Sequence, residues 1–333
     1  MLAAIAAIAA IAAIAIGLSA CDYDGYQPND LGRLVPRTVD EDASLPSITV
    51  NGTRLHAETA GDPQNLILIV LHGGPGADYR SLLNCRAFAA QGYFVVFYDQ
   101  RGSGLSQRYP KSLYTLKTHE DDLGAVIRYY RRFPAQKVSL RGHSWGDMLA
   151  AAYVNSNPTV VNGLIIGEAG GLVWKDVDEY ITRSRDVSLL SEALNNATYA
   201  DQFFTGNRDQ HRVLDYKFAL LSTTDGAKDS PVGNEGALPY WRSGAVVFDA
   251  LYNLGKKQKP DWTLDLAQFR TRVVFVYSQN NTAYGEAHAR KVSGAFLNVQ
   301  LERINDAGHD MLSFPRGFAN FFPLALNYLN GPR

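Results

Sequence analysis

The sequence of 333 residues is poor in cysteine and in net charge, and each shortage excludes a class of protein. Its two cysteines, Cys21 and Cys85, are too few for a disulfide scaffold or a cysteine-rich zinc site. With 32 basic and 33 acidic residues the formal charge is −1, so the chain lacks the basic field of a nucleic-acid-binding protein. No cluster of metal-ligand residues is apparent, so we expect neither a metal nor an organic cofactor. The apolar share of 46% is typical of a globular protein.

Charge is also missing locally, because residues 1–20 contain no charged side chain and 18 apolar ones. This run ends in the sequence LSAC, which resembles the lipobox of bacterial lipoproteins and places the lipid attachment point at Cys21. The resemblance implies a signal peptide over 1–20, a palmitate-type lipid anchor and a tether over 21–46. It also implies a location on a membrane of the bacterial cell envelope, facing the periplasm or the exterior. The absence of a basic residue at the start leaves an uncleaved anchor and a plain secretory peptide as alternatives.

From residue 47 onward, short apolar runs alternate with helical patterns. The alternation predicts an α/β fold, with a mostly parallel sheet covered by helices on both faces. The predicted strands are 47–50, 54–58, 66–71, 94–98, 137–140, 164–166, 273–277 and 299–304, and the predicted helices are 79–91, 117–133, 145–156, 286–295 and 315–329.

One interval breaks the alternation. Residues 172–261 lack buried-strand runs and are too long for an ordinary connection. We therefore predict a core formed by 47–171 and 262–333 with a helical cap inserted over 172–261.

The sequence GHSWG at residues 142–146 lies between a predicted strand and a predicted helix. This is the context in which G-x-S-x-G forms a sharp turn that exposes a nucleophilic serine. The flanking glycines avoid clashes that side chains would make with the strand and the helix. Ser144 is therefore the predicted nucleophile.

A second glycine-rich motif, HGGPG at residues 72–76, directly follows a predicted buried strand. Such a turn exposes backbone N–H groups, which can stabilise the oxyanion of a tetrahedral intermediate. Pro75 has no N–H, so we predict that Gly74 and Trp145 supply the two donors.

A histidine follows the last predicted strand in the sequence DAGHD at residues 306–310. Its late position satisfies the chain order serine, acid, histidine that this class of site requires. The other six histidines lie inside the glycine motifs or on predicted elements without a partner motif. His309 is therefore the predicted general base.

Together with YDQRGSGLS at residues 98–106, these motifs resemble the α/β-hydrolase fold, and within it the proline iminopeptidase group. The resemblance covers 47–330 and implies a peptidase that acts through an acyl-enzyme. In that group Asp99 and Arg101 shape a turn, and we interpret them as structural here. Serine at position 144 argues against haloalkane dehalogenase and epoxide hydrolase chemistry, which uses an aspartate at this position.

The acid of the triad is not where the family usually has it. Asn281 stands at the expected aspartate position after the strand 273–277, and an amide cannot balance the charge of an imidazolium. Glu168 follows the strand after the nucleophile helix, a position from which some α/β-hydrolases take their acid. We predict that Glu168 orients His309, with Asn281 as a neutral alternative. The remaining candidates for this role are Asp306, Asp310 and Glu286.

The predicted cap gives mixed signals about the substrate. Carboxylates that could hold a substrate ammonium are Asp176, Asp178, Glu179, Glu192 and Glu235. Aromatic residues that could line an apolar pocket, or form the cap's own core, are Trp174, Tyr180, Phe203, Phe204 and Trp241. The leading prediction is a serine hydrolase most like a proline iminopeptidase, and a carboxylesterase or lipase of small acyl esters is the alternative. A non-catalytic binding or sensing module on the same fold is the alternative of another class.

Overall fold

The computed structural model describes residues 34–184, 211–216, 218–219, 231–236 and 238–331. The predicted signal peptide and Cys21 lie outside the described residues, as do Glu192, Phe203 and Phe204 from the predicted cap. No helix in these described ranges is both long enough and apolar enough to cross a bilayer.

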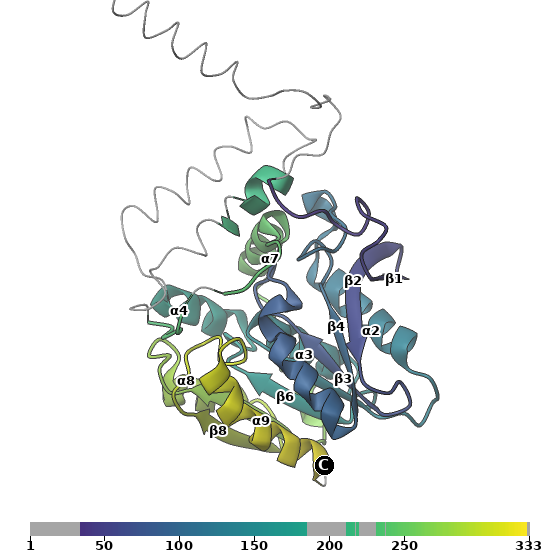
Figure 1. Ribbon diagram of the computed structural model, residues 1–333. Coiled ribbons are helices and arrows are strands. Elements are labelled where there is room, and N and C mark those ends of the chain that lie inside the picture. The colour runs from purple at the N-terminus through teal and green to yellow at the C-terminus, as the bar shows by residue number, and fades with distance from the viewer. Residues whose placement is uncertain (1–33, 185–210, 217, 220–230, 237, 332–333) are drawn as a thin grey trace, which may run out of the picture. The chain divides into compact units, whose positions relative to one another are not determined.

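Within the described residues, eight strands form one sheet in the order β1-β2-β4-β3-β5-β6-β7-β8 (Figure 1). The two N-terminal strands pair antiparallel, and all strands from β3 to β8 run parallel to their neighbours. The predicted α/β fold is therefore confirmed, and each predicted strand end lies within two residues of the observed one. The strands are β1 (Ser47–Val50), β2 (Thr53–Ala60), β3 (Leu66–Leu71), β4 (Tyr93–Tyr98), β5 (Val138–Gly142), β6 (Gly163–Gly167), β7 (Val273–Ser278) and β8 (Val299–Ile304).

Helices cover both faces of the sheet because the apolar strands bury alternate residues on opposite sides. On β3, Ile67 and Ile69 pack in the core that includes α2 and α3, whereas Leu68 and Val70 pack in the core that includes η1 and α9. The helices are η1 (Tyr79–Gln91, of 3₁₀ type), η2 (Lys111–Leu113), α2 (Leu116–Tyr130), α3 (Trp145–Ser156), α4 (Trp174–Ser184), α7 (Ala245–Gln258), η5 (Leu266–Gln268), α8 (Gly285–Ser293) and α9 (Pro315–Asn330).

The free thiol of Cys85 on η1 is fully buried, and burial raises its pKa to about 12. At neutral pH it is therefore a protonated, small apolar group of the core.

The two ends of the interval 172–261 lie side by side. Val173 and Asp261 form an antiparallel β-bridge, and the Trp262 N–H donates to the Leu172 carbonyl at 2.9 Å. Between these ends the described residues include α4 and α7, and the cap boundaries themselves stay a prediction. The chain thus leaves the sheet after β6 and returns to the same place before β7.

Residues 34–46, which fall in the predicted tether, pack against the body. The side chain of Val39 is fully buried, and its N–H donates to the Leu105 carbonyl at 2.8 Å. The Arg242 guanidinium donates to the Pro36 carbonyl at 2.8 Å. Because these contacts bury apolar and polar groups together, residues 34–46 join the body, whereas the prediction placed a tether over 21–46.

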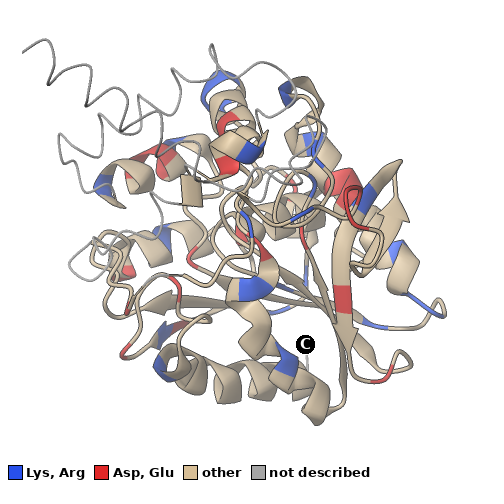
Figure 2. Cartoon of the chain, turned by 45° about the horizontal axis from the view of Figure 1, so that its top comes forward, with Lys and Arg blue, Asp and Glu red and all other residues tan. Residues whose placement is uncertain are grey.

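Charges of both signs are interspersed over the helices and loops in the view of Figure 2, and few lie on the central strands.

Candidate active site

Ser144 occupies the turn between β5 and α3, and its backbone has φ 54° and ψ −114°. A non-glycine residue in this region is strained by about 1–3 kcal/mol, which the surrounding structure must offset. The side chain is half-buried and lines a cavity. Such a turn is the geometry in which a serine hydroxyl projects beyond the end of a sheet.

Both glycines of GHSWG lie so close to neighbouring segments that a side chain would not fit at either position. A Cβ on Gly146 would lie 2.2 Å from the Leu71 carbonyl oxygen of β3. A Cβ on Gly142 would lie 2.6 Å from the Asp147 carboxylate of α3. Each clash is well inside van der Waals contact, so any larger residue would push Ser144 out of position.

Glu168 follows β6, is fully buried, and meets His309 from the loop after β8. Its Oε2 lies 2.7 Å from Nδ1 of His309. Its Oε1 accepts from the Ser278 N–H at 2.6 Å and from the Ser278 hydroxyl at 2.5 Å. Glu168 itself has φ 63°, a second strained residue in the site. The structure thus brings together the acid and histidine that the sequence reasoning paired, within direct hydrogen-bond reach.

The pKa shifts of this pair favour an ion pair or a strong charge-assisted hydrogen bond. Burial opposes ionisation of Glu168, but the hydrogen bond and charge of His309 and the bonds from Ser278 hold its pKa below the usual value. Burial also opposes protonation of His309, but the Glu168 hydrogen bond and the Asp310 charge raise the His309 pKa to about 8. Because Glu168 is a charged acceptor, Nδ1 carries the proton, and Nε2 is left for proton transfer.

Asn281 supports the acid instead of replacing it. Its amide nitrogen donates to Glu168 Oε2 at 2.9 Å and to the Tyr180 hydroxyl at 3.1 Å. The Tyr180 oxygen in turn lies 3.1 Å from Nδ1 of His309. None of the described hydrogen bonds joins Asn281 directly to His309. The amide therefore stabilises the Glu168 anion, and the alternative of Asn281 as the direct partner of the imidazole is not what the geometry shows.

His143, beside the nucleophile, holds the backbone of the histidine loop. Its Nε2 donates to the His309 carbonyl at 2.8 Å, and the two rings lie 4.8 Å apart. Burial lowers the His143 pKa to about 4, so the ring is neutral at pH 7. His143 thus links the serine turn to the histidine loop without adding charge.

The predicted oxyanion donors, Gly74 and Trp145, come from the turn after β3 and from the start of α3. Trp145 begins α3, so its N–H has no carbonyl partner within the helix. Gly74 has φ +114°, and a Cβ there would lie 2.5 Å from the Gly76 nitrogen. Both residues line the same cavity as Ser144. The arrangement can present two N–H groups to a carbonyl oxygen held at Ser144.

The cavity at Ser144 has a volume of about 280 Å³ and an apolar wall. Its floor includes Ser144 and Met148 of the body, and α4 and α7 form the wall. None of the described lining residues is charged. The wall residues are Trp174, Val177, Tyr180, Ile181, Phe248, Leu251 and Tyr252. Such a cavity suits an uncharged group of small or medium size.

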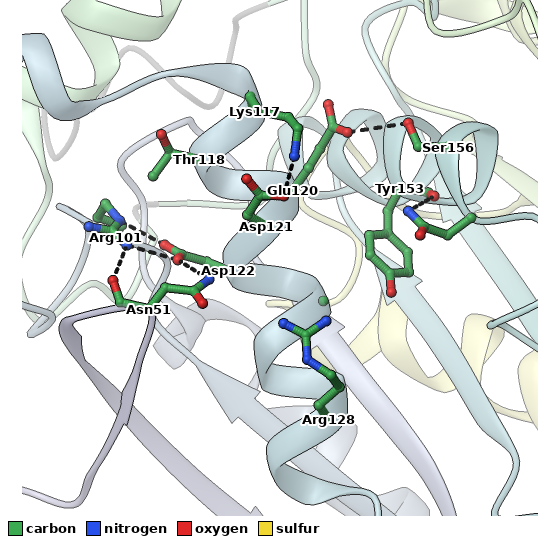
Figure 3. Close-up of a pocket in the computed structure, with 12 residues that line it drawn as sticks. Asn51, Arg101, Lys117, Thr118, Glu120, Asp121, Asp122, Arg128, Tyr153 and Ser156 are labelled. Carbon is green, nitrogen blue, oxygen red and sulfur yellow. Dashed lines mark hydrogen bonds and ion pairs between the residues drawn. The ribbon is translucent and has the colours of Figure 1, made fainter. Parts of the chain in front are cut away.

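A second, more polar hollow of about 650 Å³ lies between α2 and α3, away from Ser144 (Figure 3). Its charged side chains neutralise one another, since Arg101 pairs with Asp122 at 2.7 Å and Lys117 with Asp121. Arg101 also contacts the Asn51 carbonyl (Figure 3). These contacts fit the structural interpretation of Arg101 and give the hollow no group poised for chemistry.

The acidic cap candidates differ in their surroundings. Asp176 is buried and pairs with Lys291, while Asp178 and Glu179 are exposed. Glu235 is half-buried, and its Oε1 has no hydrogen-bond partner among the described residues. None of these four carboxylates lines the cavity at Ser144.

One possible metal-ligand group occurs among the described residues, formed by His143, His309 and Asp310, whose ligand atoms lie within 4.8 Å of one another. Nδ1 of His309 is already bonded to Glu168, and Nε2 of His143 to a carbonyl. Two ring nitrogens of this group are therefore already used in hydrogen bonds, which makes the group a poor candidate for binding a cation.

A buried ion pair beneath the serine turn was not predicted. Arg141 is fully buried on β5, with its guanidinium 3.6 Å from Asp147 Oδ1 and stacked on the Phe321 ring at 4.6 Å. Asp147 Oδ2 accepts from the Gly167 N–H at 2.8 Å, directly before Glu168. The available signal was a lone arginine at the end of an apolar strand, three residues before the nucleophile.

Comparison with known proteins agrees with this architecture. The model of the α/β hydrolase fold family matches residues 67–314, about three quarters of the chain. A proline iminopeptidase of Thermoplasma volcanium is 39% identical over 105 residues (32% of this chain and 34% of that protein). One of Heyndrickxia coagulans is 41% identical over 99 residues (29% of this chain and 33% of that protein). The matches thus span about a third of these relatives' length.

Among solved structures, the proline iminopeptidase of Mycobacterium smegmatis superposes with a TM-score of 0.54 at 16% identity, covering 86% of this chain and 100% of that one. At this identity the likeness concerns the fold alone. Strand order, serine turn and family match agree, and this chain belongs to the α/β hydrolase fold family.

Proposed function

We propose that the chain is a serine hydrolase that cleaves an ester or amide bond through an acyl-enzyme. Ser144 attacks the carbonyl carbon while Nε2 of His309 takes the hydroxyl proton, and the N–H groups of Gly74 and Trp145 bind the oxyanion. His309 then protonates the leaving group. In the second half, water attacks the acyl carbonyl while His309 takes its proton, and His309 returns that proton to the Ser144 oxygen as the acyl group is released. Glu168 balances the imidazolium. The observation that carries the proposal is the 2.7 Å contact between Glu168 and His309 beside a strained serine turn.

The relatives favour a peptidase of the proline iminopeptidase kind as the leading activity. Such an enzyme must hold a free substrate ammonium. Among the described cap carboxylates, Glu235 has a buried oxygen without a hydrogen-bond partner, although it does not line the cavity at Ser144.

A carboxylesterase of small acyl esters is the second candidate, and the cavity favours it. The described lining of that cavity is apolar and uncharged, which suits an acyl chain better than an ammonium group.

Labelling with a fluorophosphonate probe tests the proposed chemistry. Wild type should be labelled and Ser144→Ala should not, while Glu168→Gln should be labelled far more slowly than Asn281→Asp. An unlabelled wild type would favour the non-catalytic binding module. Turnover of proline p-nitroanilide against p-nitrophenyl butyrate then separates the peptidase from the esterase.

We also propose that residues 1–20 are a lipoprotein signal peptide and that Cys21 carries the lipid that holds the enzyme on the bacterial cell envelope. The support is the LSAC sequence after an uncharged apolar run. Metabolic labelling with a palmitate analogue should mark the wild type and not Cys21→Ser. Equal labelling of both would contradict the lipid attachment.

A further inference from the structure

We propose that Gln100 is a positioning residue of the oxyanion hole. Its contacts keep the two segments that carry the Gly74 and Trp145 N–H donors in place relative to each other. The inference rests on the proposed function, since it concerns how the donors of Gly74 and Trp145 are kept in place. Gln100 lies in the turn after β4 and is only 2% exposed. Its two neighbours in the sequence, Asp99 and Arg101, have structural partners. The catalytic mechanism proposed above assigns no role to Gln100.

The side chain of Gln100 joins the two motifs that supply the oxyanion donors. Its amide nitrogen donates to the His72 carbonyl at 2.9 Å, two residues before Gly74. Its amide oxygen accepts from the indole N–H of Trp145 at 2.8 Å. One buried amide therefore ties the glycine turn after β3 to the first residue of α3.

The backbone of Gln100 fixes the protonation of His72. Its N–H lies 2.9 Å from Nε2 of His72 and can only donate, so Nε2 is unprotonated and acts as the acceptor. The proton of the neutral ring is then on Nδ1, which lies 2.9 Å from the Gly73 carbonyl oxygen and donates to it. Burial lowers the His72 pKa, in agreement with a neutral ring.

The bond from His72 to Gly73 orients the donor of Gly74, because both groups belong to one peptide unit. In a planar trans peptide the carbonyl and the N–H point in opposite directions. Holding the Gly73 oxygen on the His72 side therefore directs the Gly74 N–H to the other side. Gly74 has φ +114° and lacks a Cβ, so no side chain of its own restrains this peptide.

Glutamine meets both requirements of this position, whereas similar residues do not. A donor is needed toward the His72 carbonyl and an acceptor toward the Trp145 indole. Glutamate would place an unprotonated oxygen against a carbonyl, and methionine would satisfy neither group. Glutamate would therefore leave the His72 carbonyl without a partner, and methionine would leave both that carbonyl and the Trp145 indole N–H without one.

The experiment is steady-state kinetics and inhibitor binding for Gln100→Met, which keeps the length and volume of the side chain. We expect kcat to fall roughly ten- to a hundredfold, less than the 10²- to 10³-fold typical when a whole oxyanion donor is removed, with KM little changed. Affinity for a boronic acid, which forms a tetrahedral adduct with the serine, should fall by a similar factor. Trp145→Phe removes only the indole donor, so its effect should be smaller and not additive with Gln100→Met.

Gln136→Met is the matched control. Gln136 is 3% exposed, and its amide makes three hydrogen bonds to backbone groups far along the chain from the site motifs. It should lose thermal stability as Gln100→Met does, with kcat unchanged. Equal loss of kcat in both variants, or a Gln100→Met enzyme with wild-type kcat and boronate affinity, would overturn the role of Gln100. An unlabelled wild type in the fluorophosphonate assay would instead overturn the proposed function itself.

Discussion

The carboxyl edge of the sheet and the wall of the cavity are built on different physical principles. At the edge, the acid of the site is held by directional hydrogen bonds, since Glu168 contacts Ser278, Asn281 and His309. In the wall, α4 and α7 present apolar side chains whose contacts are non-directional. The edge can therefore fix a geometry to fractions of an ångström, while the wall fixes a volume and a polarity.

This difference predicts that kcat and KM respond to substitutions in different parts of the site. Substitutions at the edge should act on kcat, since they move groups that interact with the transition state. Substitutions in the wall should act on KM and on the choice of substrate, since they change binding that ground state and transition state share.

The largest effect should come from Ser144→Ala, which removes the nucleophile. We expect kcat to fall roughly 10⁴- to 10⁶-fold with KM nearly unchanged, as in other serine enzymes that act through a triad. Ser156→Ala, at the other end of the same helix, is the control and should retain full activity. A Ser144→Ala protein that keeps more than about a hundredth of the activity would place the nucleophile elsewhere.

The next largest effect should come from Glu168→Gln, because the imidazolium would lose its counter-charge. Loss of the acid in comparable triads costs about 10⁴-fold in kcat, and we expect roughly 10²- to 10⁴-fold here. Adding Asn281→Asp should restore about tenfold, since a carboxylate would then face the same hydroxyl of Tyr180 that reaches His309.

The single variant Asn281→Asp is the control for this rescue. It sets two carboxylates against each other where an amide now donates at 2.9 Å, so it should be slower than wild type. A double variant slower than Glu168→Gln alone would show that position 281 cannot serve the histidine.

The pH profile of kcat/KM should depend on the interaction between Glu168 and His309. Because the base must be neutral, kcat/KM should rise with pH and level off above the His309 pKa of about 8, with a loss of about tenfold per unit below it. In Glu168→Gln the burial of the ring, which lowers its pKa, is no longer opposed by the carboxylate. The rising limb should then move to lower pH, and an unmoved limb would contradict the coupling.

The smallest effect should come from the wall. Leu251→Ala enlarges the cavity, so we expect selectivity to shift toward longer acyl groups by about tenfold in kcat/KM, the scale of one or two methylenes. Leu264→Ala, at a side chain that is 76% exposed, is the matched control and should change nothing. Measuring a series of p-nitrophenyl esters checks both, and an unchanged preference in Leu251→Ala would mean that the acyl group binds elsewhere.

The same contrast explains what could be read from the sequence. Apolar runs predicted the strands to within two residues, because a buried parallel strand leaves a continuous pattern. Ser144, His309 and Gly74 could be named from motifs that impose local backbone geometry. Glu168 could be named because an acid directly after a buried strand has little else to do.

Contacts between segments remote in sequence left no such pattern. Tyr180 reaches His309 only because α4 packs over the sheet edge, and its aromatic ring is equally typical of a core. The direction of the Asn281 amide depends on where Glu168 lies, and the three bonds of Gln100 depend on the spacing of two separate turns. These properties belong to tertiary packing and not to local propensity.

The bridge between Val173 and Asp261 makes the intervening segment a side branch of the chain. Paired residues in an antiparallel ladder have Cα atoms about 4.5–5.5 Å apart, a gap that a turn of a few residues can close. The stretch between them could be cut out or exchanged without moving a strand of the sheet. Substrate range could therefore change by exchange within this segment while the catalytic residues stay in place, as long as Tyr180 keeps its contact with His309.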